Sequence, residues 1–174
     1  MKEKLRNLFA EIIRDFRLPR YDELPNVGIY LEQVTQYING VITPLGCQEM
    51  TSSMISNYVK KGVVSAPIKK QYYADQIAYL IFVSIGKQVI SIENISKLYD
   101  MQKLVYDVPT AYNYFCDEFE NMLQVISGIK DTAETIGVTQ SKEKEMLRSV
   151  IIAVANIIFV NYSFEKMREE KEKS

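Results

Sequence analysis

The chain has 174 residues, of which 47% are hydrophobic and 25% are charged, and this composition excludes a disordered chain apart from the last few residues. Histidine is absent, which removes the usual general base and the usual zinc or iron ligand, so we expect no enzyme activity, no cofactor and no metal site. The formal net charge of −1 excludes a general attraction to polyanions, so binding of nucleic acid would need a local basic patch.

Two amphipathic helices are expected before the middle of the chain. The first runs from Lys2 to Arg17 and ends at Leu18-Pro19, because the residue before a proline resists the helical conformation. A turn follows at Pro25 to Gly28. The second helix spans Ile29 to Ile38 and should end at Gly40. It would be the first helix of a helix-turn-helix.

The segment after Met50 predicts a short helix with clear ends. Three hydroxyl residues, Thr51 to Ser53, suit its start, and Gly62 can adopt the left-handed conformation that ends it. Ile55 and Val59 fall on one stripe that would face the core. The opposite face is small and polar, as expected of a helix that enters the major groove of DNA and approaches base edges.

A short β-prone segment, Val63 to Tyr73, follows and carries Lys69 and Lys70 near its middle. We expect a wing whose tip reaches phosphates. Two further helices should close the unit. One is almost entirely apolar and spans Asp75 to Gly86, and the other spans Ser91 to Leu98 and has a serine at its N-cap.

The C-terminal part of the chain predicts a helical hairpin. Its first helix runs from Pro109, a favoured first-turn position, to about Ser127. This helix is expected to expose its acidic residues Asp117, Glu118 and Glu120 as solvated surface. A loop from Gly128 to Thr139 follows.

A long helix is expected from Ser141 to about Met167, followed by a charged tail from Lys166 to Ser174 that frays. Its middle is apolar nearly all round, so it must be covered on every side. Either a homodimer buries this helix, or neighbouring helices of the same chain wrap it. We divide the chain into residues 1–104, which hold the N-terminal helix and the winged helix-turn-helix, and residues 105–174, a helical dimerisation or effector subdomain.

Charge is unevenly distributed along the chain. From Thr51 to Ile90 there are five lysines and one carboxylate, Asp75, whereas the segment from Leu104 to Ser174 carries eight basic and twelve acidic residues. A basic patch on an otherwise acidic protein suits DNA binding, because neutralisation of phosphates drives affinity. Solvated helix faces can carry the same charges, so both interpretations stay open.

The order of residues in the central segment resembles a known family. The residues that carry the likeness are Tyr58, Lys61-Gly62-Val63-Val64, Pro67, Tyr72-Tyr73, Asp75-Gln76-Ile77 and Ile90 to Ile95. They are similar to the DNA-binding domain of MerR-type regulators, which implies a winged helix-turn-helix with a small β wing in an otherwise all-α protein. With the upstream residues, the stretch from Leu18 to Met101 also resembles the bacterial family called domain of unknown function 1836, whose name carries no activity.

The sequence departs from the MerR pattern at three places. Ser56 and Asn57 stand where the recognition helix of the family has an arginine and a tyrosine. The segment from Pro67 to Tyr72 is short and lacks an Asn-Gly turn, and the stretch from Gly40 to Met50 is longer than a tight turn. A fold tolerates such changes more easily than DNA contacts do. A winged-helix protein-interaction module that does not bind DNA is therefore the alternative.

We expect a DNA-binding transcriptional regulator of MerR-like type that acts on double-stranded DNA as a homodimer. The candidate DNA-binding residues are Ser52, Ser53, Ser56, Asn57, Lys60, Lys61, Lys69 and Lys70. Tyr58 and Tyr72 would pack the wing against its helix. A third function, sensing of a small apolar effector, would use tyrosines such as Tyr106, Tyr112 and Tyr114 as pocket walls.

Two further expectations concern location and the cysteines. The start of the chain, Met1 to Lys4, is charged and unlike a secretory signal, and the apolar run from Val150 to Val160 is shorter than the roughly twenty residues of a membrane helix. A cytoplasmic protein without membrane contact is expected. Cys47 and Cys116 lack metal-ligand spacing, so Cys116 is expected to be a small core residue and not a sensor.

Overall fold

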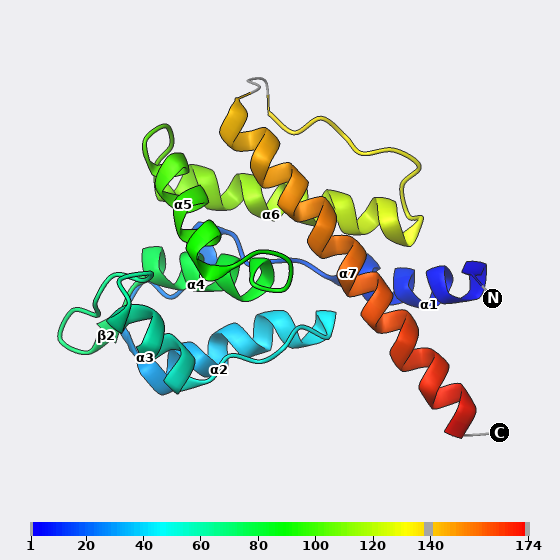
Figure 1. Ribbon diagram of the computed structural model, residues 1–174, viewed down its shortest axis with the longest axis horizontal. Helices are drawn as coiled ribbons and strands as arrows, with labels where there is room; N and C mark the ends of the chain where they lie inside the picture. The colour runs from blue at the N-terminus through cyan, green and yellow to red at the C-terminus, as the bar shows by residue number, and fades with distance from the viewer. Residues whose placement is uncertain (1, 138–140, 173–174) are drawn as a thin grey trace.

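The computed structural model describes residues 2–137 and 141–172 of the chain. The fold is mostly helical with a small two-stranded antiparallel sheet (Figure 1). The α-helices of the described residues are α1 (Lys2–Asp15), α2 (Leu31–Ile42), α3 (Ser52–Lys60), α4 (Ala74–Gly86), α5 (Ile92–Lys103), α6 (Val108–Ser127) and α7 (Lys142–Glu172). Between them lie β1 (Ile29–Tyr30), β2 (Gln71–Tyr72) and two 3-10 helices, η1 (Tyr21–Glu23) and η2 (Thr43–Leu45). The expected helical class with a small β element is confirmed.

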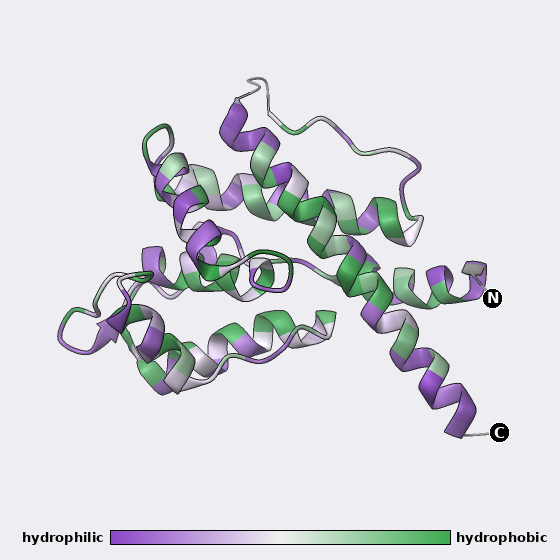
Figure 2. Cartoon of the chain, viewed as in Figure 1, coloured by the Kyte–Doolittle hydropathy of each residue, from purple (hydrophilic) through white to green (hydrophobic). Residues whose placement is uncertain are grey.

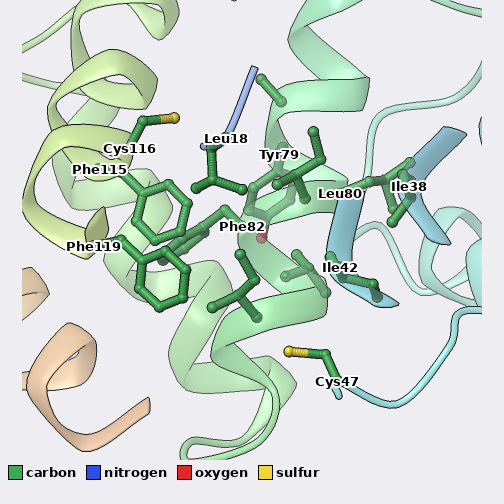
Figure 3. Close-up of a cluster of buried hydrophobic side chains, with 14 of the residues drawn as sticks. Leu18, Ile38, Ile42, Cys47, Tyr79, Leu80, Phe82, Phe115, Cys116 and Phe119 are labelled. Atoms are coloured by element: carbon green, nitrogen blue, oxygen red, sulfur yellow. The ribbon is translucent and has the colours of Figure 1, made fainter. Parts of the chain in front are cut away.

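Helix α4 is the centre of the fold. Every residue from Gln76 to Gly86 is buried, as the sequence predicted for this apolar helix. It packs against α2, α5, α6 and α7. Figure 3 shows Ile38 of α2 and Phe115 of α6 near opposite ends of the same cluster, with Leu80 and Phe82 of α4 between them. The ring centroids of Phe82 and Phe115 are 5.1 Å apart, in an edge-to-face contact.

One hydrophobic core spans both parts of the chain. Buried residues of α1 and α4 belong to the same cluster as those of α6 and α7. At one end of this core, the ring of Phe9 in α1 lies 5.3 Å from that of Phe159 in α7, measured between centroids. Residues on either side of residue 104 share this core. The division of the chain at that residue stays a prediction.

Both ends of α2 differ from the expectation. The helix begins at Leu31 and not at Ile29, because Ile29 and Tyr30 pair with β2, and it does not end at Gly40 but continues to Ile42. Ile38 and Ile42 are both fully buried on its inner face, and their burial outweighs the roughly 1 kcal/mol by which one glycine disfavours a helix. The chain turns instead at Gly46, which closes η2 with a φ of 67°.

Three other helix ends also differ. α1 ends at Asp15 and not at Arg17. α5 continues beyond Leu98 to Lys103, where the ring of Tyr99 stacks on that of Tyr79 with centroids 3.8 Å apart. The prediction for the end of the chain was wrong as far as the structure describes it. α7 passes Met167 and ends at Glu172, and an ion pair of 2.6 Å joins Lys4 to Glu170. Residues 173 and 174 of the expected tail, and 138 and 139 of the expected loop, lie outside the described residues.

The segment from Leu18 to Tyr21, which leads from α1 into η1, ties the N-terminal helix to α6. Its central side chain, Arg20, donates from both terminal nitrogens to the carboxylate of Glu120, at 2.7 and 2.8 Å, and from one of them to Asp117 at 2.8 Å. The backbone N–H of Leu18 donates to the same Glu120 carboxylate at 2.8 Å. The hydrogen bond to Glu120 raises the pKa of Arg20 above its ordinary value, so this cation stays charged at every accessible pH.

The expectation that α6 exposes its acidic residues was wrong for two of them. Glu118 is 1% exposed, accepts a hydrogen bond from the hydroxyl of Tyr114 at 3.1 Å and lies 4.0 Å from Arg148 of α7. Glu120 is largely buried beneath Arg20. Both carboxylates face arginines from distant parts of the chain, and these arginines lower the cost of burying the negative charges.

Replacement of Arg20 by alanine should lower the free energy of unfolding by about 2–3 kcal/mol, because Glu120 would remain buried without its counter-ion. Chemical denaturation of the purified variant measures this change. The matched control is Arg17→Ala, which removes an exposed pair with Glu23 and should have a much smaller effect. Equal effects of the two substitutions would contradict the role assigned to Arg20.

Candidate nucleic-acid interface

Helix α3 begins and ends where the sequence predicted. The side-chain oxygen of Thr51 accepts a hydrogen bond from the backbone N–H of Met54 at 3.1 Å, which caps the N-terminus. After the last helical residue, Gly62 adopts a φ of 72° and reverses the chain. Ile55 and Tyr58 form the buried side of the helix.

Two polar contacts hold α3 against α2. The side-chain amide of Asn39 in α2 donates to the carbonyl of Met50 at 2.9 Å and accepts from its N–H at 2.8 Å. The hydroxyl of Ser52 donates to the carboxylate of Glu32 at 2.9 Å and lies 3.1 Å from the hydroxyl of Thr35. The pair of helices is therefore fixed at the start of α3, even though the connection between them is long.

These contacts separate Ser52 from the other candidate residues of α3. Ser53, Ser56, Asn57 and Lys60 are exposed, whereas the hydroxyl of Ser52 is engaged with α2. The exposed residues form a continuous polar face, as the 3.6-residue spacing requires. In this structure the side chain of Ser52 links α3 to α2.

The segment expected to form a wing, and called the wing below, is a hairpin whose tip consists of Lys69 and Lys70. Ile68 and Gln71 exchange two backbone hydrogen bonds, of 3.0 and 2.9 Å, around these two residues. Both lysines have positive φ angles, 51° and 66°. Two central residues with positive φ define a type I′ turn, which ordinarily contains Asn-Gly or a similar pair. The hairpin thus forms without the Asn-Gly sequence that its turn favours.

The strand that continues from this tip is joined to the segment before α2. β1 and β2 pair antiparallel, with Ile29 opposite Tyr72 and Tyr30 opposite Gln71. Gly28 lies so close to the wing that an added Cβ would stand 2.8 Å from the Cβ of Gln71. Only glycine fits at this position without a shift of the hairpin.

The base of the wing is attached to α4 and to α3. The side-chain amide of Gln76, a buried residue, donates to the carbonyls of Ser65 and Ala66 at 2.9 and 3.1 Å. The carbonyl of Tyr58 accepts from the N–H of Val63 at 2.9 Å. Tyr58 and Tyr72 are themselves buried, as expected for residues beneath a wing. The tip extends from a base that is anchored to the core.

Not every charge of the basic segment lies on this surface. Lys87 is half-buried, its ammonium group lies 3.4 Å from the sulfur of Met50, and burial lowers its pKa. Asp75 accepts a hydrogen bond from the hydroxyl of Tyr21. The exposed cations of the segment are Lys60, Lys61, Lys69 and Lys70.

The tyrosines expected to line a pocket are only partly brought together. Tyr106 and Tyr112 line a cavity of about 30 Å³ between α4, α5 and α6, but Tyr114 lines a different hollow. Within the described residues, the hydroxyls of Tyr79 and Tyr112 are buried without a hydrogen-bond partner, and both side chains line the first cavity. A cavity of this size holds about one water molecule and not an organic effector.

The two cysteines lie in the core and are not reactive groups. Cys47 and Cys116 are both buried and free (Figure 3). Burial raises the pKa of the Cys47 thiol to about 11 and that of the Cys116 thiol to about 12. In the part of the chain that the structure describes, no group of three potential ligand side chains could hold a metal ion. Cys116 is a small core residue, as expected.

Iodoacetamide at pH 8 should therefore modify neither cysteine in the folded protein and both in the unfolded chain, which mass spectrometry can count. The raised pKa values also predict loss of stability in alkali. In the unfolded chain the thiols ionise near pH 9, whereas in the folded protein burial keeps them protonated to higher pH. Their contribution to the free energy of unfolding is therefore complete below pH 9 and is lost as the pH rises to 11 to 12. Rapid modification of the folded protein would contradict this assignment.

Fold and site together define a helical protein with an exposed polar face on α3 and an exposed cationic hairpin tip. The chain belongs to the family described as a domain of unknown function (DUF1836), which matches residues 19–115. The match confirms the resemblance seen from Leu18 to Met101 and extends it into α6. It contains α3, the wing and Arg20, whereas most of the C-terminal helices lie outside it. Comparison with curated proteins and with solved structures found no match.

Proposed function

We propose that the protein is a DNA-binding transcriptional regulator with a MerR-like winged helix-turn-helix, and that it acts on double-stranded DNA as a dimer. The observation that carries this proposal is the hairpin tip, in which the exposed Lys69 and Lys70 hold positive φ angles, and the exposed polar face of α3 accompanies it. The conformation of this tip would be reached at lower cost by asparagine and glycine. Strained positions of this kind are commonly found at functional sites.

The order of the elements supports the same proposal. α2 and α3 correspond to the two helices of the motif, and the hairpin from Val63 to Tyr72 corresponds to the wing. Ser53, Ser56 and Asn57 would face base edges in the major groove, while the exposed lysines would contact phosphates. The C-terminal helices would bring two such units together on a pseudo-palindromic site.

A winged-helix protein-interaction module is the second candidate. The observation that favours it is the absence of arginine between Thr51 and Ile90, because arginine is the commonest reader of guanine. Both functions would use the same exposed surface, and binding to DNA at different salt concentrations separates them. We propose no small effector for the described cavity, because its volume is too small.

Fluorescence anisotropy with promoter-region DNA from the source genome tests the proposal directly. Affinity should fall steeply with salt, with a slope of about one logarithmic unit for each phosphate contact. Absence of binding at low salt would contradict DNA recognition and would support the interaction module.

The double substitution Lys69→Asn/Lys70→Gly separates charge from conformation at the wing tip. It should raise the free energy of unfolding by about 1 kcal/mol, because Asn-Gly suits the type I′ turn. It should nevertheless weaken DNA binding at every sequence and reduce the salt slope by about one unit for each lysine removed. Denaturation and anisotropy measure the two effects.

The matched control is Arg14→Gln/Lys130→Gln, which removes two cations far along the chain from the wing and should leave DNA affinity nearly unchanged. Lys69→Glu/Lys70→Glu should weaken binding further. A stabilised Asn-Gly variant with the affinity of the parent would refute a phosphate-binding wing.

Asn57→Ala should act differently from the wing variants. If Asn57 reads a base edge, its loss should relax sequence preference by about 1–3 kcal/mol at one position of the site and leave the salt slope unchanged. Competition between specific and random DNA measures the preference. An unchanged preference would remove Asn57 from the base-reading surface.

A further inference from the structure

Helix α7 has two apolar faces, and only one of them is covered. Its inner face consists of buried residues that pack on α5, α6, α4 and α1, namely Leu147, Ile151, Val154, Ala155 and Ile158. Large hydrophobic side chains remain 36–60% exposed on the same helix, namely Met146, Ile152, Ile157, Val160 and Phe164. Figure 2 shows hydrophobic residues along the middle of α7.

Four of these residues form one stripe together with Ala153, which is also exposed, whereas Ile152 lies to one side of it. Met146, Ala153, Ile157, Val160 and Phe164 recur at steps of seven, four, three and four, which places them on one side of a helix. Side chains with these exposures offer roughly 400 Å² of apolar surface, as large as the largest patches on typical monomers. Such a patch normally has an occupant.

Two small residues of the stripe, Ser149 and Ala153, lie between Met146 and its centre, whereas the bulky residues Val160 and Phe164 follow the centre. If a second helix of the same sequence runs antiparallel about a point between residues 156 and 157, Ser149 faces Phe164 and Ala153 faces Val160. Bulky side chains then meet small ones, as close packing requires.

A parallel arrangement lacks this complementarity. There each residue would face its own copy, so Phe164 would meet Phe164 and Ser149 would meet Ser149. The first pair would crowd the contact and the second would leave a gap, and each costs packing energy.

Charges beyond the stripe favour the same direction. The antiparallel register brings the exposed carboxylate of Glu145 opposite the exposed guanidinium of Arg168, once on each side of the axis. Lys142 and Lys171 also come opposite one another, but they lie at the outer ends, where solvent and salt screen the repulsion. A parallel pair would instead place Glu145 against Glu145 and Arg168 against Arg168.

A hollow beside the stripe offers further space for the partner. It is about 590 Å³ in volume and lies between Gly46, at the end of η2, and the C-terminal part of α7, including Phe164 and Arg168. With this hollow and the polar flanks of the stripe, two copies would bury on the order of 1,200 Å² in total, the lower end for a specific dimer.

We propose that α7 pairs with α7 of a second copy of this chain, in the antiparallel direction and centred between Asn156 and Ile157. This inference deepens the dimer in the proposed function by naming its face and direction. It does not depend on DNA binding.

The test measures the oligomeric state of the full chain by sedimentation velocity over a range of concentrations, without DNA. The parent should dimerise. Glu145→Arg and Arg168→Glu should each weaken association by about tenfold, and the double variant Glu145→Arg/Arg168→Glu should recover most of it, because the pair is restored with reversed charges. A parallel dimer would show no such recovery, so its absence would overturn the proposed direction.

Cysteine cross-linking supplies an independent readout, because both native cysteines are buried. A mixture of Ala153→Cys and Val160→Cys chains should form a disulfide between the two variants. Formation of Ala153→Cys homodimers instead would overturn the antiparallel arrangement.

Two other outcomes would overturn the pairing itself. α7 is the one helix of the described residues that is long and apolar enough to cross a membrane, and 28% of its most apolar window is buried. A parent that stays monomeric in solution would refute pairing with a second copy. So would a monomeric parent that floats with vesicles of phosphatidylglycerol and phosphatidylcholine, because the membrane would then be the partner of α7.

A dimeric parent that binds no DNA would uphold this inference and defeat the proposed function.

Discussion

The fold depends on burial of α4 on all its faces. A helix that is apolar all round needs a layer on every side, and this chain supplies α2 on one side and α5, α6 and α7 on the others. The requirement also positions the wing. Gln76 lies in the first turn of α4, and its amide holds the carbonyls of Ser65 and Ala66, so the base of the hairpin is attached to the most buried element of the protein. This attachment fixes the position of the hairpin, even though Lys69 and Lys70 at its tip adopt strained backbone angles.

The segment from Leu18 to Tyr21 adds a second constraint of a different kind. Arg20 joins two acidic side chains of α6, and Tyr21 holds Asp75 at the start of α4. This segment thus connects the C-terminal helices to the helix from which the wing is held. The family match begins within this segment, at residue 19, and the contacts of the segment in this structure join helices to one another. The candidate interface therefore rests on α3 and the hairpin.

Local signals predicted most of the helices correctly, whereas contacts between distant residues could not be predicted. The caps at Thr51 and Ser91 are visible in the sequence because a cap needs only neighbours along the chain. Gly40 was misleading, since burial of Ile38 and Ile42 overrides a local preference. Glu118 looked like solvated surface because its partner Arg148 is thirty positions away. The Lys69-Lys70 turn lacks the usual turn residues, so only the backbone angles identify it.

α4 and α7 show most clearly what a sequence pattern leaves open. Both are apolar nearly all round, and the pattern alone demands that each be covered. The structure covers α4 completely and α7 on one face, because the chain has only enough helices to surround one of them. The uncovered face of α7 is not uniformly apolar, as a lipid-facing surface could be. Its small residues Ser149 and Ala153 lie before Asn156, which is near the middle, and its bulky residues Val160 and Phe164 lie after it. When two copies of α7 run antiparallel, the small residues of one face the bulky residues of the other. A two-fold symmetric interface requires this self-complementarity.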